Sequence, residues 1–205
     1  MNRAIASAAI FLVALAVPAG AQAQNASMTP QELLAAAKAT YPGELCSWAR
    51  VEENMDAAAS WTLTFRYDYE KKDGPDRAVV LHQLPCFYGA YNFGSIWFME
   101  TEFEGLVPLH FAEPVLDIEY ADGDDAVVEK LTVLGFSTTP TLIDGAFDQE
   151  TQTISSFSKW RGLADAASSG TWTFREGAFV LTRYEVDATY DGESNPVTVY
   201  SAAGN

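Results

Sequence analysis

Residues 61–69 read WTLTFRYDY, and this stretch decides the fold class. Apolar or aromatic side chains stand at every second position from Trp61 to Tyr69, and polar side chains stand between them. Successive side chains of an extended chain point to opposite faces, so an alternation with period two indicates a β-strand with one apolar face. The sequence therefore predicts a strand over residues 61–70 that packs one face on a core.

Similar strand patterns continue along the chain. A turn with a Gly-Pro pair at residues 71–76 leads into a returning strand at 77–84. Further strands are predicted at 95–104, 106–111, 115–120, 127–134, 145–148, 153–157, 170–175, 178–187 and 197–201. Asp-Gly and Glu-Gly pairs separate most of them, which is typical of tight turns. About ten short strands with this spacing predict a mainly β fold, an antiparallel sandwich or a barrel-like sheet.

One N-terminal helix is predicted before the strands, over residues 28–41. Thr29 and Glu32 have the spacing of a capping box, in which each side chain satisfies a backbone amide of the other residue. Pro30 suits the first helical position, because its missing N–H has no partner there in any helix. The helix is expected to end before the Pro-Gly pair at residues 42–43.

The composition excludes several classes of function. The chain has 205 residues, with 28 acidic and 12 basic side chains and a formal net charge of −16. Binding to nucleic acid or to an anionic membrane surface needs clustered Lys and Arg, so neither partner is expected. Only two Cys and two His are present, so no multi-ligand zinc, haem or iron–sulfur site and no cofactor is predicted.

Residues 1–23 have the pattern of a secretory signal peptide. Arg3 supplies a positive charge, and residues 4–17 form a mostly apolar run that is too short to span a bilayer. A site of the form A-x-A ends at Ala23, where we expect cleavage. Residues 24–205 are then expected to form a single β-rich domain with no membrane span. These features predict a soluble periplasmic or secreted protein.

Cys46 and Cys86 are predicted to form a disulfide. In an oxidising compartment, two cysteines of one domain usually pair. The closed loop of about 40 residues would stabilise the fold by roughly 4 kcal/mol in the chain-entropy description. The alternative is two free, buried thiols. A catalytic CxxC arrangement is absent from the sequence.

Motifs of catalysis are weak. His82 and His110 occur without a Gly-x-Ser-x-Gly elbow or a His-Glu-x-x-His motif, so both are expected to be structural or surface residues. The acidic residues 122–125 (DGDD) lack the spacing of an EF-hand loop, and a solvated turn is expected there. The same expectation applies to the acidic cluster within residues 144–150. A catalytic pair of carboxylates can be neither excluded nor picked out by counting.

The segment 155–174 holds the best candidates for a binding surface, because long polar loops between strands often carry function. The guanidinium of Arg161 could bind a carboxylate of a partner, and Trp160 could serve as an aromatic anchor. The alternative is a structural loop in which Arg161 pairs internally with Asp165. The candidate binding residues are Lys159, Trp160, Arg161, Ser168, Ser169 and Gly170.

Three stretches, taken together, resemble a known family. They are residues 84–92 (LPCFYGAYN), residues 147–159 (FDQETQTISSFSK), and RGL at 161–163 followed by SSGTW at 168–172. The chain resembles, from about residue 35 to residue 192, the C-terminal part of exported bacterial proteins that share a domain of unknown function, DUF1176. The resemblance implies export and a β-rich fold, and it brings no established activity.

The chain departs from that family at one pair of positions. Members often read Gly-Asp-Cys-Gly where this chain has residues 164–167 (ADAA), and they often have a partner Cys near the segment that is here 188–192. Loss of both is expected for a paired disulfide, since one remaining Cys would be a reactive thiol. The loop around Arg161 is therefore expected to be less tightly pinned than in those relatives.

A more distant likeness, at Ser169-Gly170, is to periplasmic inhibitors of lysozyme-type hydrolases. Those are small exported β-proteins that fill an enzyme cleft with a loop containing Ser-Gly. The strongly negative charge of this chain would steer it toward basic proteins such as lysozymes.

These observations predict a non-enzymatic binding or inhibitory module of the cell envelope, whose partner is an envelope protein or a peptidoglycan-related molecule. The alternatives are a hydrolase that cleaves envelope glycans with a pair of carboxylates, and a purely structural envelope protein. The lack of a nucleophile–base motif favours binding over catalysis. A pair of carboxylates clustered in a concave pocket would favour the hydrolase.

Overall fold

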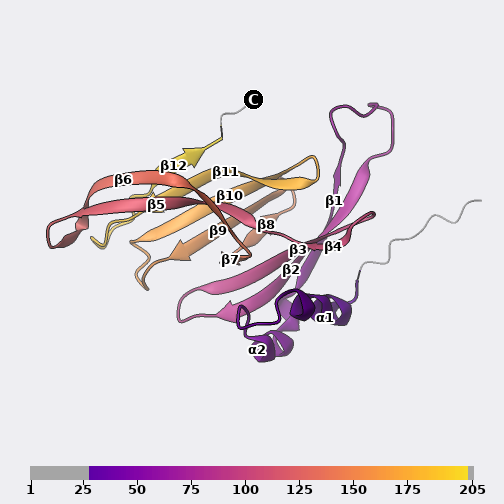
Figure 1. The fold of residues 1–205 in the computed structure, drawn as a ribbon, viewed down its shortest axis with the longest axis horizontal. Helices are drawn as coiled ribbons and strands as arrows, with labels where there is room; N and C mark the ends of the chain where they lie inside the picture. The colour runs from indigo at the N-terminus through magenta and orange to yellow at the C-terminus, as the bar shows by residue number, and fades with distance from the viewer. Residues whose placement is uncertain (1–27, 203–205) are drawn as a thin grey trace, which may run out of the picture.

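The protein is mainly β-sheet, and its strands pair antiparallel in the described part of the chain (Figure 1). A computed structural model describes residues 28–202. Its elements are α1 (Pro30–Thr40), α2 (Trp48–Glu53), the 3-10 helix η1 (Met55–Ala57), β1 (Ala59–Phe65), β2 (Arg77–Tyr88), β3 (Phe93–Thr101), β4 (Gly105–Pro108), β5 (Phe111–Ala121), β6 (Asp124–Thr139), β7 (Thr141–Ile143), β8 (Ala146–Asp148), β9 (Thr153–Lys159), β10 (Ala167–Arg175), β11 (Ala178–Asp187) and β12 (Val197–Ser201).

Within these residues the strands form two larger sheets and a ribbon. The first sheet has the order β1–β2–β3–β4, with β7 also paired to β3, and the second has the order β12–β11–β10–β9–β8. Strands β5 and β6 form a long two-stranded ribbon. The prediction of a mainly β, antiparallel fold is confirmed, and the separate sheets are consistent with the sandwich.

The strand that the alternation predicted over residues 61–70 ends at Phe65. The physical reason is Arg66, whose guanidinium organises the loop that follows. It donates hydrogen bonds back into that loop, to the carbonyl oxygens of Lys71 (2.9 Å), Lys72 and Gly74 (2.6 Å) and to the carboxylate of Asp76 (2.7 Å from a terminal nitrogen). The chain therefore turns out of the sheet, and Tyr67 and Tyr69 belong to a loop.

Large aromatic residues fill the core between the two five-stranded sheets. Trp97 on β3 and Trp172 on β10 are fully buried. Phe111, at the start of β5, lies between them, with ring centroids 6.4 Å from Trp97 and 5.3 Å from Trp172. The indole Nε1 of Trp172 donates to the carbonyl oxygen of Ala112 at 3.0 Å. This contact joins the ribbon to the second sheet.

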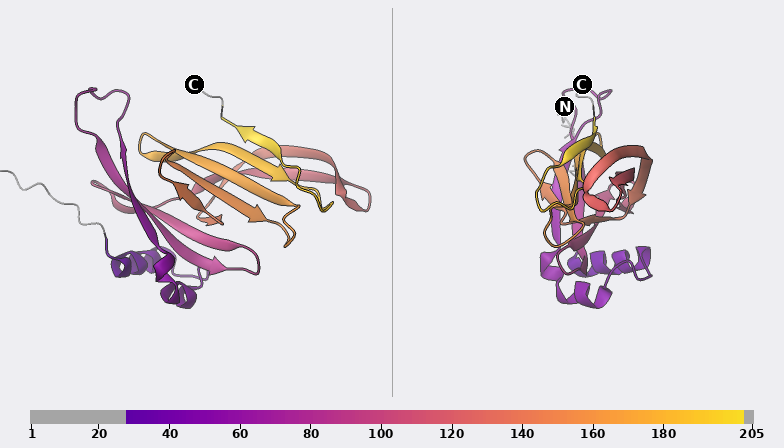
Figure 2. Two further views of the ribbon diagram at one scale, coloured as in Figure 1. Left: turned by 180° about the vertical axis from the view of Figure 1, so that it is seen from behind. Right: turned by 90° about the vertical axis from the view of Figure 1, so that its left-hand side faces the viewer.

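The helices cover the other face of the first sheet, at one end of the molecule (Figure 2). The predicted capping box is confirmed: the Thr29 hydroxyl accepts from the Glu32 amide at 3.3 Å, and the Glu32 carboxylate accepts from the Thr29 amide at 2.9 Å. Leu33 of α1 and Val51 of α2 are buried in a second apolar cluster, which also contains Phe98 of β3.

The short helices α2 and η1 were not predicted. Helix α2 has six residues, and its N-cap residue Ser47 makes no capping hydrogen bond with its side chain. Isolated helices of this length are unstable in water, so packing against the sheet has to hold them. The sequence gives no helical signal of comparable strength to that of α1.

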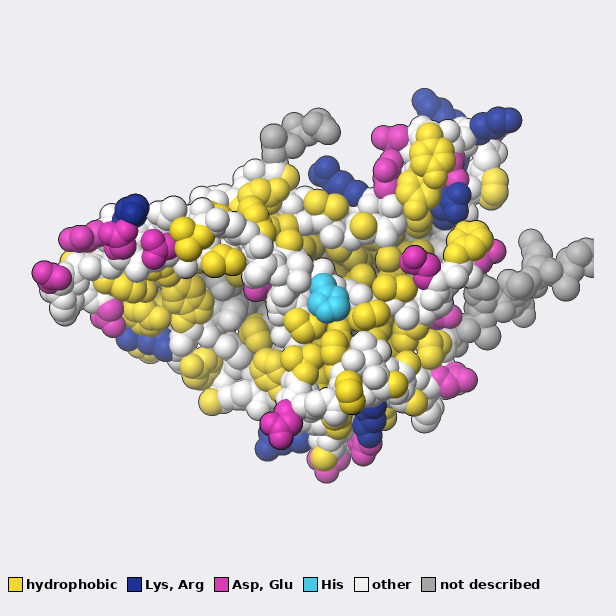
Figure 3. Space-filling model, in the orientation of Figure 1, with side chains coloured by type: hydrophobic (Ala, Val, Ile, Leu, Met, Phe, Trp, Pro, Cys, Tyr) yellow, Lys and Arg dark blue, Asp and Glu magenta, His cyan; other side chains and the backbone are white. Residues whose placement is uncertain are grey.

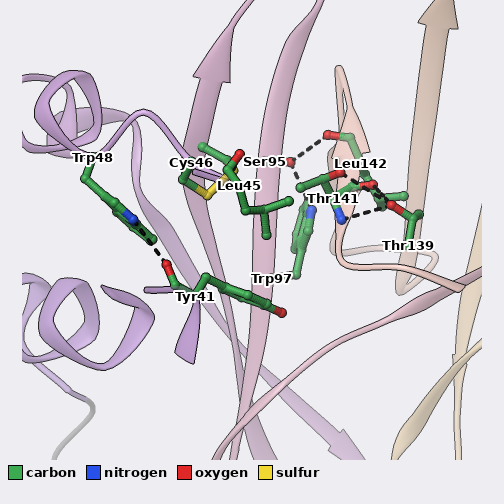
Figure 4. Close-up of a disulfide and its surroundings, with 10 residues drawn as sticks. Tyr41, Leu45, Cys46, Trp48, Ser95, Trp97, Thr139, Thr141 and Leu142 are labelled. Carbon is green, nitrogen blue, oxygen red and sulfur yellow. Dashed lines mark hydrogen bonds between the residues drawn. A yellow bond between two sulfur atoms is a disulfide. The ribbon is translucent and has the colours of Figure 1, made fainter. Parts of the chain in front are cut away.

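The predicted disulfide between Cys46 and Cys86 is present in the structure, with Cα atoms 4.5 Å apart (Figure 4). Both residues are buried in the helix-side cluster. Next to the bridge, the Ser47 amide donates to the carbonyl oxygen of Cys86 at 2.8 Å, and the indole of Trp48 donates to the carbonyl oxygen of Tyr41 at 3.2 Å. The bridge thus attaches the segment before α2 to strand β2.

Other predicted bounds differ from the structure mainly at strand ends. The ribbon strands extend well beyond the predicted 115–120 and 127–134, whereas β11 and β12 have the predicted bounds. Strand β7, with three residues, was missed.

None of the helices within residues 28–202 is long and apolar enough to cross a membrane. The predicted signal peptide, residues 1–23, lies outside the described residues.

Candidate functional site

The six predicted binding residues divide between a short turn and a strand. Lys159 is the last residue of β9, and Trp160 and Arg161 begin the turn of residues 160–166 that leads to β10. The other three, Ser168, Ser169 and Gly170, lie inside β10, where β9 pairs on one side and β11 on the other. The turn is therefore shorter than the loop expected within residues 155–174, and the Ser-Ser-Gly stretch lies in the middle of a sheet.

Gly170 leaves room for an aromatic ring of its own strand. A Cβ atom at this position would lie only 2.3 Å from the ring of Trp172. Ser168, also buried, has its hydroxyl 3.3 Å from the indole Nε1 of Trp160, which donates to it. Two of the small residues predicted to bind a partner, Ser168 and Gly170, thus contact neighbouring tryptophans.

Arg161 pairs internally with Asp165, as the alternative interpretation expected. Its Nε donates to Asp165 Oδ1 at 2.7 Å, its second terminal nitrogen donates to the other carboxylate oxygen, and that nitrogen also donates to the carbonyl of Tyr190 at 2.9 Å. Asp165 is 3% exposed and accepts the amide of Gly192 at 2.8 Å. The guanidinium carbon lies 5.2 Å from the centroid of the Tyr190 ring. Arg161 therefore links the turn to the segment after β11.

Lys159 and Trp160 contact the turn between β2 and β3. The Asn92 amide group bonds the backbone of Lys159 twice, accepting from its N–H at 3.2 Å and donating to its carbonyl at 2.8 Å. The Lys159 ammonium donates to the carbonyl of Tyr91 at 3.0 Å, and the Tyr91 hydroxyl donates to the carbonyl of Trp160 at 3.4 Å. These bonds join the first and second sheets at one end.

A large cavity lies elsewhere, at the tip of the β1–β2 hairpin. We call it the aromatic cleft; its volume is about 990 Å³. Three segments line it: the hairpin tip, the loop between β3 and β4, and the turn between β10 and β11 at Gly177. In Figure 3 the hairpin tip stands out from the body of the molecule and carries hydrophobic, acidic and basic side chains close together.

Aromatic rings supply much of the cleft's surface. Tyr67 and Tyr69 are stacked, with ring centroids 5.1 Å apart and planes 10° apart. Tyr69 is 79% exposed, and Phe103 from the facing loop is 80% exposed. The Arg77 guanidinium lies over Tyr67, 5.1 Å from the ring centroid. The rings of Tyr69 and Phe103 are therefore both accessible to a ligand in the cleft.

Ion pairs hold the polar part of the cleft in place. Arg77 donates to one carboxylate oxygen of Glu70, from Nε at 2.9 Å and from a terminal nitrogen at 2.6 Å. Because Arg77 and the Tyr67 amide both donate to this carboxylate, the pKa of Glu70 is lowered. The Asp68 amide donates to Glu176 at 3.0 Å, which attaches the hairpin tip to the β10–β11 turn.

Sequence reasoning missed this cleft, because Tyr67 and Tyr69 continued the alternation of β1 and were read as strand residues. One signal was present: the two tyrosines stand beside a Gly-Pro turn, where an aromatic pair has no sheet to pack on.

The stretches that carried the family resemblance meet at the junction of the two sheets. Asn92 of the first stretch bonds Lys159 of the second, and Ser158 of the second pairs with Ser168 of the third. A family described as "Protein of unknown function (DUF1176)" matches residues 12–198 of the chain. The chain belongs to this family. Comparisons with curated proteins and with solved structures found no match.

The two segments in which DUF1176 members were expected to carry a disulfide lie side by side here. Asp165, next to Ala166, bonds Gly192, and Arg161 bonds Tyr190. Ala166 and Ala188 are both buried. In this DUF1176 protein the Arg161–Asp165 ion pair lies within the turn, and hydrogen bonds between its two members and residues 190 and 192 connect the segments.

Of the remaining sequence candidates in this DUF1176 chain, all but His82 lie at the surface or in turns. His110 is exposed beside the start of β5. Asp124 accepts the Ala126 amide at 3.0 Å and Asp148 accepts the Glu150 amide at 2.8 Å, as turn residues do. No group of three His, Cys, Asp or Glu side chains within residues 28–202 is placed to hold a metal ion. His82 is buried in the first sheet, beside Ser60 and Glu100.

Asp165→Asn is expected to lower the melting temperature at pH 7. Arg161 donates to the Asp165 carboxylate and, with backbone amides, lowers its pKa below the usual 3.8. A carboxylate with a lowered pKa stabilises the fold above its ordinary pKa, and this contribution is lost as the pH falls toward the folded-state value. Thermal melts from pH 7 to pH 2 should therefore show the wild-type and variant curves converging in acid. Glu193→Gln, an exposed acid on the same segment, serves as the control and should change little. Equal melting temperatures of wild type and Asp165→Asn at pH 7 would contradict the structural role.

Proposed function

We propose that this protein is an exported binding module of the cell envelope, and that its aromatic cleft binds an envelope glycan of the peptidoglycan type. The observation that carries the proposal is the cleft itself, with the exposed rings of Tyr69 and Phe103 beside ion-paired polar groups. The signal-peptide pattern of residues 1–23 supports export, as does the disulfide, which persists in oxidising compartments.

Sugar rings suit this surface for a physical reason. The C–H groups on one face of a pyranose ring are weakly positive, and the faces of aromatic rings are negative, so the two stack. The hydroxyl and amide groups at the rim of the sugar need donors and acceptors, which Arg77 and the carboxylates at the mouth supply. A cleft of about 990 Å³ is large enough for a ligand of several rings.

The cleft is also organised before any ligand arrives. Arg66 holds the hairpin loop through the carbonyl oxygens of Lys71 and Gly74, and Glu176 holds the Asp68 amide. A rigid site loses little conformational entropy on binding, which raises affinity. This preorganisation supports a recognition role for the loop.

The carboxylates of the cleft favour binding over glycan hydrolysis. A glycosidase needs one carboxyl group with a raised pKa that donates a proton to the leaving oxygen. Glu70 has a lowered pKa because Arg77 donates to it, and Asp76 accepts from Arg66. Glu70 is therefore held as an anion by Arg77, which is the opposite of what an acid catalyst requires.

The likeness to inhibitors of lysozyme-type hydrolases receives less support. That likeness rested on Ser169-Gly170, which lie in the middle of β10 and pair on both sides instead of forming a loop. Only the negative charge of the chain continues to favour a basic partner of that kind.

Co-sedimentation with purified peptidoglycan tests the proposal. The chain is recovered from the periplasm and checked by intact mass, with a start at Gln24 expected. Tyr69→Ala and Phe103→Ala should each weaken binding by about 2 kcal/mol, roughly 30-fold, as aromatic anchors do. Because both side chains are largely exposed, the melting temperature should stay within a few degrees of wild type.

Leu163→Ala is the matched control, since Leu163 is an equally exposed apolar side chain, 75% exposed, on the turn outside the cleft. If Leu163→Ala or Trp160→Ala abolishes binding while the two cleft variants bind normally, the binding site lies on the turn after β9, where the sequence analysis placed it. If wild type does not bind peptidoglycan but captures a lysozyme-type enzyme, the glycan proposal fails and the inhibitor function takes its place.

A further inference from the structure

Three polar side chains form a chain of contacts across the first sheet. Ser60 on edge strand β1 lies directly opposite His82 on β2, and its hydroxyl oxygen is 2.8 Å from the imidazole Nδ1. The other ring nitrogen, Nε2, is 3.3 Å from the carboxylate of Glu100 on β3. The antiparallel register places Glu100 opposite Val80, one step along the same face from His82. A hydroxyl, an imidazole and a carboxylate are therefore aligned in that order.

The hydrogen-bonding roles in this chain follow from the chemistry of the groups. A carboxylate only accepts, so the imidazole carries its proton on Nε2, facing Glu100, and Nδ1 accepts from the Ser60 hydroxyl. The imidazole of His82 is fully buried. Burial lowers its pKa, and Glu100 partly opposes this effect. The imidazole is accordingly neutral at pH 7, the form that can take a proton.

Ser60 is exposed although its partner is buried. Strand β1 is the edge of its sheet, so alternate backbone N–H groups along it point away from β2 and lack a partner in the sheet. A reactant can therefore approach the Ser60 hydroxyl from solvent, at an edge of the sheet that no other strand of the described chain covers.

We propose that Ser60 is a nucleophile that reacts with carboxylic esters, with His82 as its base and Glu100 as the residue that positions the imidazole. This activity goes beyond the proposed glycan binding and does not depend on it. The three side chains lie on the helix-side face of the first sheet, with Phe98, whereas Met99 of the cleft lies on the other face. In serine proteases of the Ser-His-Asp type, Nε2 of the histidine faces the serine and Nδ1 faces the carboxylate. Here Nδ1 faces Ser60 and Nε2 faces Glu100, but the order hydroxyl, imidazole, carboxylate is the same.

The reaction balances without any added cofactor. Ser60 Oγ bonds to the ester carbon as its proton passes to His82 Nδ1, the bond to the leaving oxygen breaks, and that oxygen takes the proton from Nδ1 and departs as an alcohol. Water then attacks the acyl-serine, Nδ1 takes one of its protons and returns it to Ser60 Oγ, and a carboxylic acid is released. The net change is ester plus water to acid plus alcohol.

Labelling with a fluorophosphonate probe, which phosphonylates an activated serine with loss of fluoride, tests the proposal on the full chain. Peptide mapping should place the label on Ser60, at a rate about 10²-fold above that of the same serine in urea-unfolded protein. Ser60→Ala should abolish labelling, and hydrolysis of p-nitrophenyl acetate with it. Thr62→Ala should change neither, since Thr62 is an exposed hydroxyl on the same strand that faces Val80 instead of an imidazole.

The pH dependence separates a reactive site from a merely structural network. The labelling rate should fall only when the pH drops below the ordinary histidine pKa of 6.5, because burial lowers the pKa of His82. Glu100→Gln should lower the rate and move this fall to still more acidic pH, since Glu100 raises the pKa of His82. His82→Gln should reduce labelling about 10²-fold, with circular dichroism to show that the variant is folded.

Labelling of Ser60 no faster in the folded than in the unfolded chain would overturn the proposal. So would a labelling rate that Glu100→Gln leaves unchanged at every pH. In either case the three residues only satisfy one another's hydrogen bonds. Because Glu100→Gln removes no nucleophile and no base, this second outcome decides the matter even if the His82 variant does not fold.

Discussion

Replacing both cysteines of the bridge, Cys46→Ala with Cys86→Ala, is expected to lower the free energy of unfolding by about 4 kcal/mol. The two residues are separated by 40 positions, and a crosslink across such a loop removes much of the freedom of the unfolded chain. Both are also buried between α2 and the first sheet, so the double substitution leaves a small cavity as well. Native proteins have free energies of unfolding of only about 5–15 kcal/mol, so this loss is a large part of the total.

Urea unfolding of the double variant and of wild type, followed by circular dichroism, measures this loss. The double variant avoids the lone thiol that either single substitution would leave. Wild type with its bridge reduced serves as the control and should lose a similar amount, since it differs only in the two thiols. A loss below about 1 kcal/mol would mean that packing of the helices, and not the crosslink, holds them to the sheet.

Trp172→Ala is expected to destabilise the protein by about 3–5 kcal/mol. The indole is fully buried at the centre of the inter-sheet core and packs on Phe111. Its removal leaves a large cavity and also takes the donor from the Ala112 carbonyl, with which Trp172 joins the second sheet to the ribbon. Urea unfolding measures the change.

Trp172→Phe separates the two contributions, because it keeps most of the apolar volume and loses the hydrogen bond. It should cost clearly less than the alanine variant. Gly170→Ala tests the same packing from the other side: the added Cβ meets the Trp172 ring at 2.3 Å, so overpacking should cost about 1–3 kcal/mol. A neutral Gly170→Ala variant together with a mild Trp172→Ala variant would show that this part of the core can rearrange freely.

The fold class could be predicted from the sequence because its signals are local. Alternation in residues 61–65, the capping box at Thr29 and the Asp-Gly turns each depend on residues a few positions apart. The ends of strands were less predictable, since they depend on distant partners. Residues 66–69 continue the alternation, yet hydrogen bonds from Arg66 to the following loop remove them from the sheet.

The candidate sites depend on contacts that no local pattern contains. The aromatic cleft forms only because the β10–β11 turn and the β3–β4 loop come to lie beside the hairpin tip. The alignment of Ser60, His82 and Glu100 depends on the register of three strands, and a shift by one residue would move these side chains to different faces. The disulfide was predictable because two cysteines leave one pairing, and an oxidising compartment was expected from the signal-peptide pattern.

Burial of strand β3 on both faces of its sheet has a consequence for how the sequence can vary. The side chains of β3 alternate between two separate cores, Trp97 and Met99 toward the second sheet and Ile96 and Phe98 toward the helices. No residue of β3 is exposed, so a random substitution in this strand disturbs the packing of one core or the other. The ribbon strand β6 has many exposed positions and should accept changes readily. Over evolutionary time, substitutions in this protein should therefore accumulate in the ribbon, while the interior of β3 drifts only among apolar residues of similar volume.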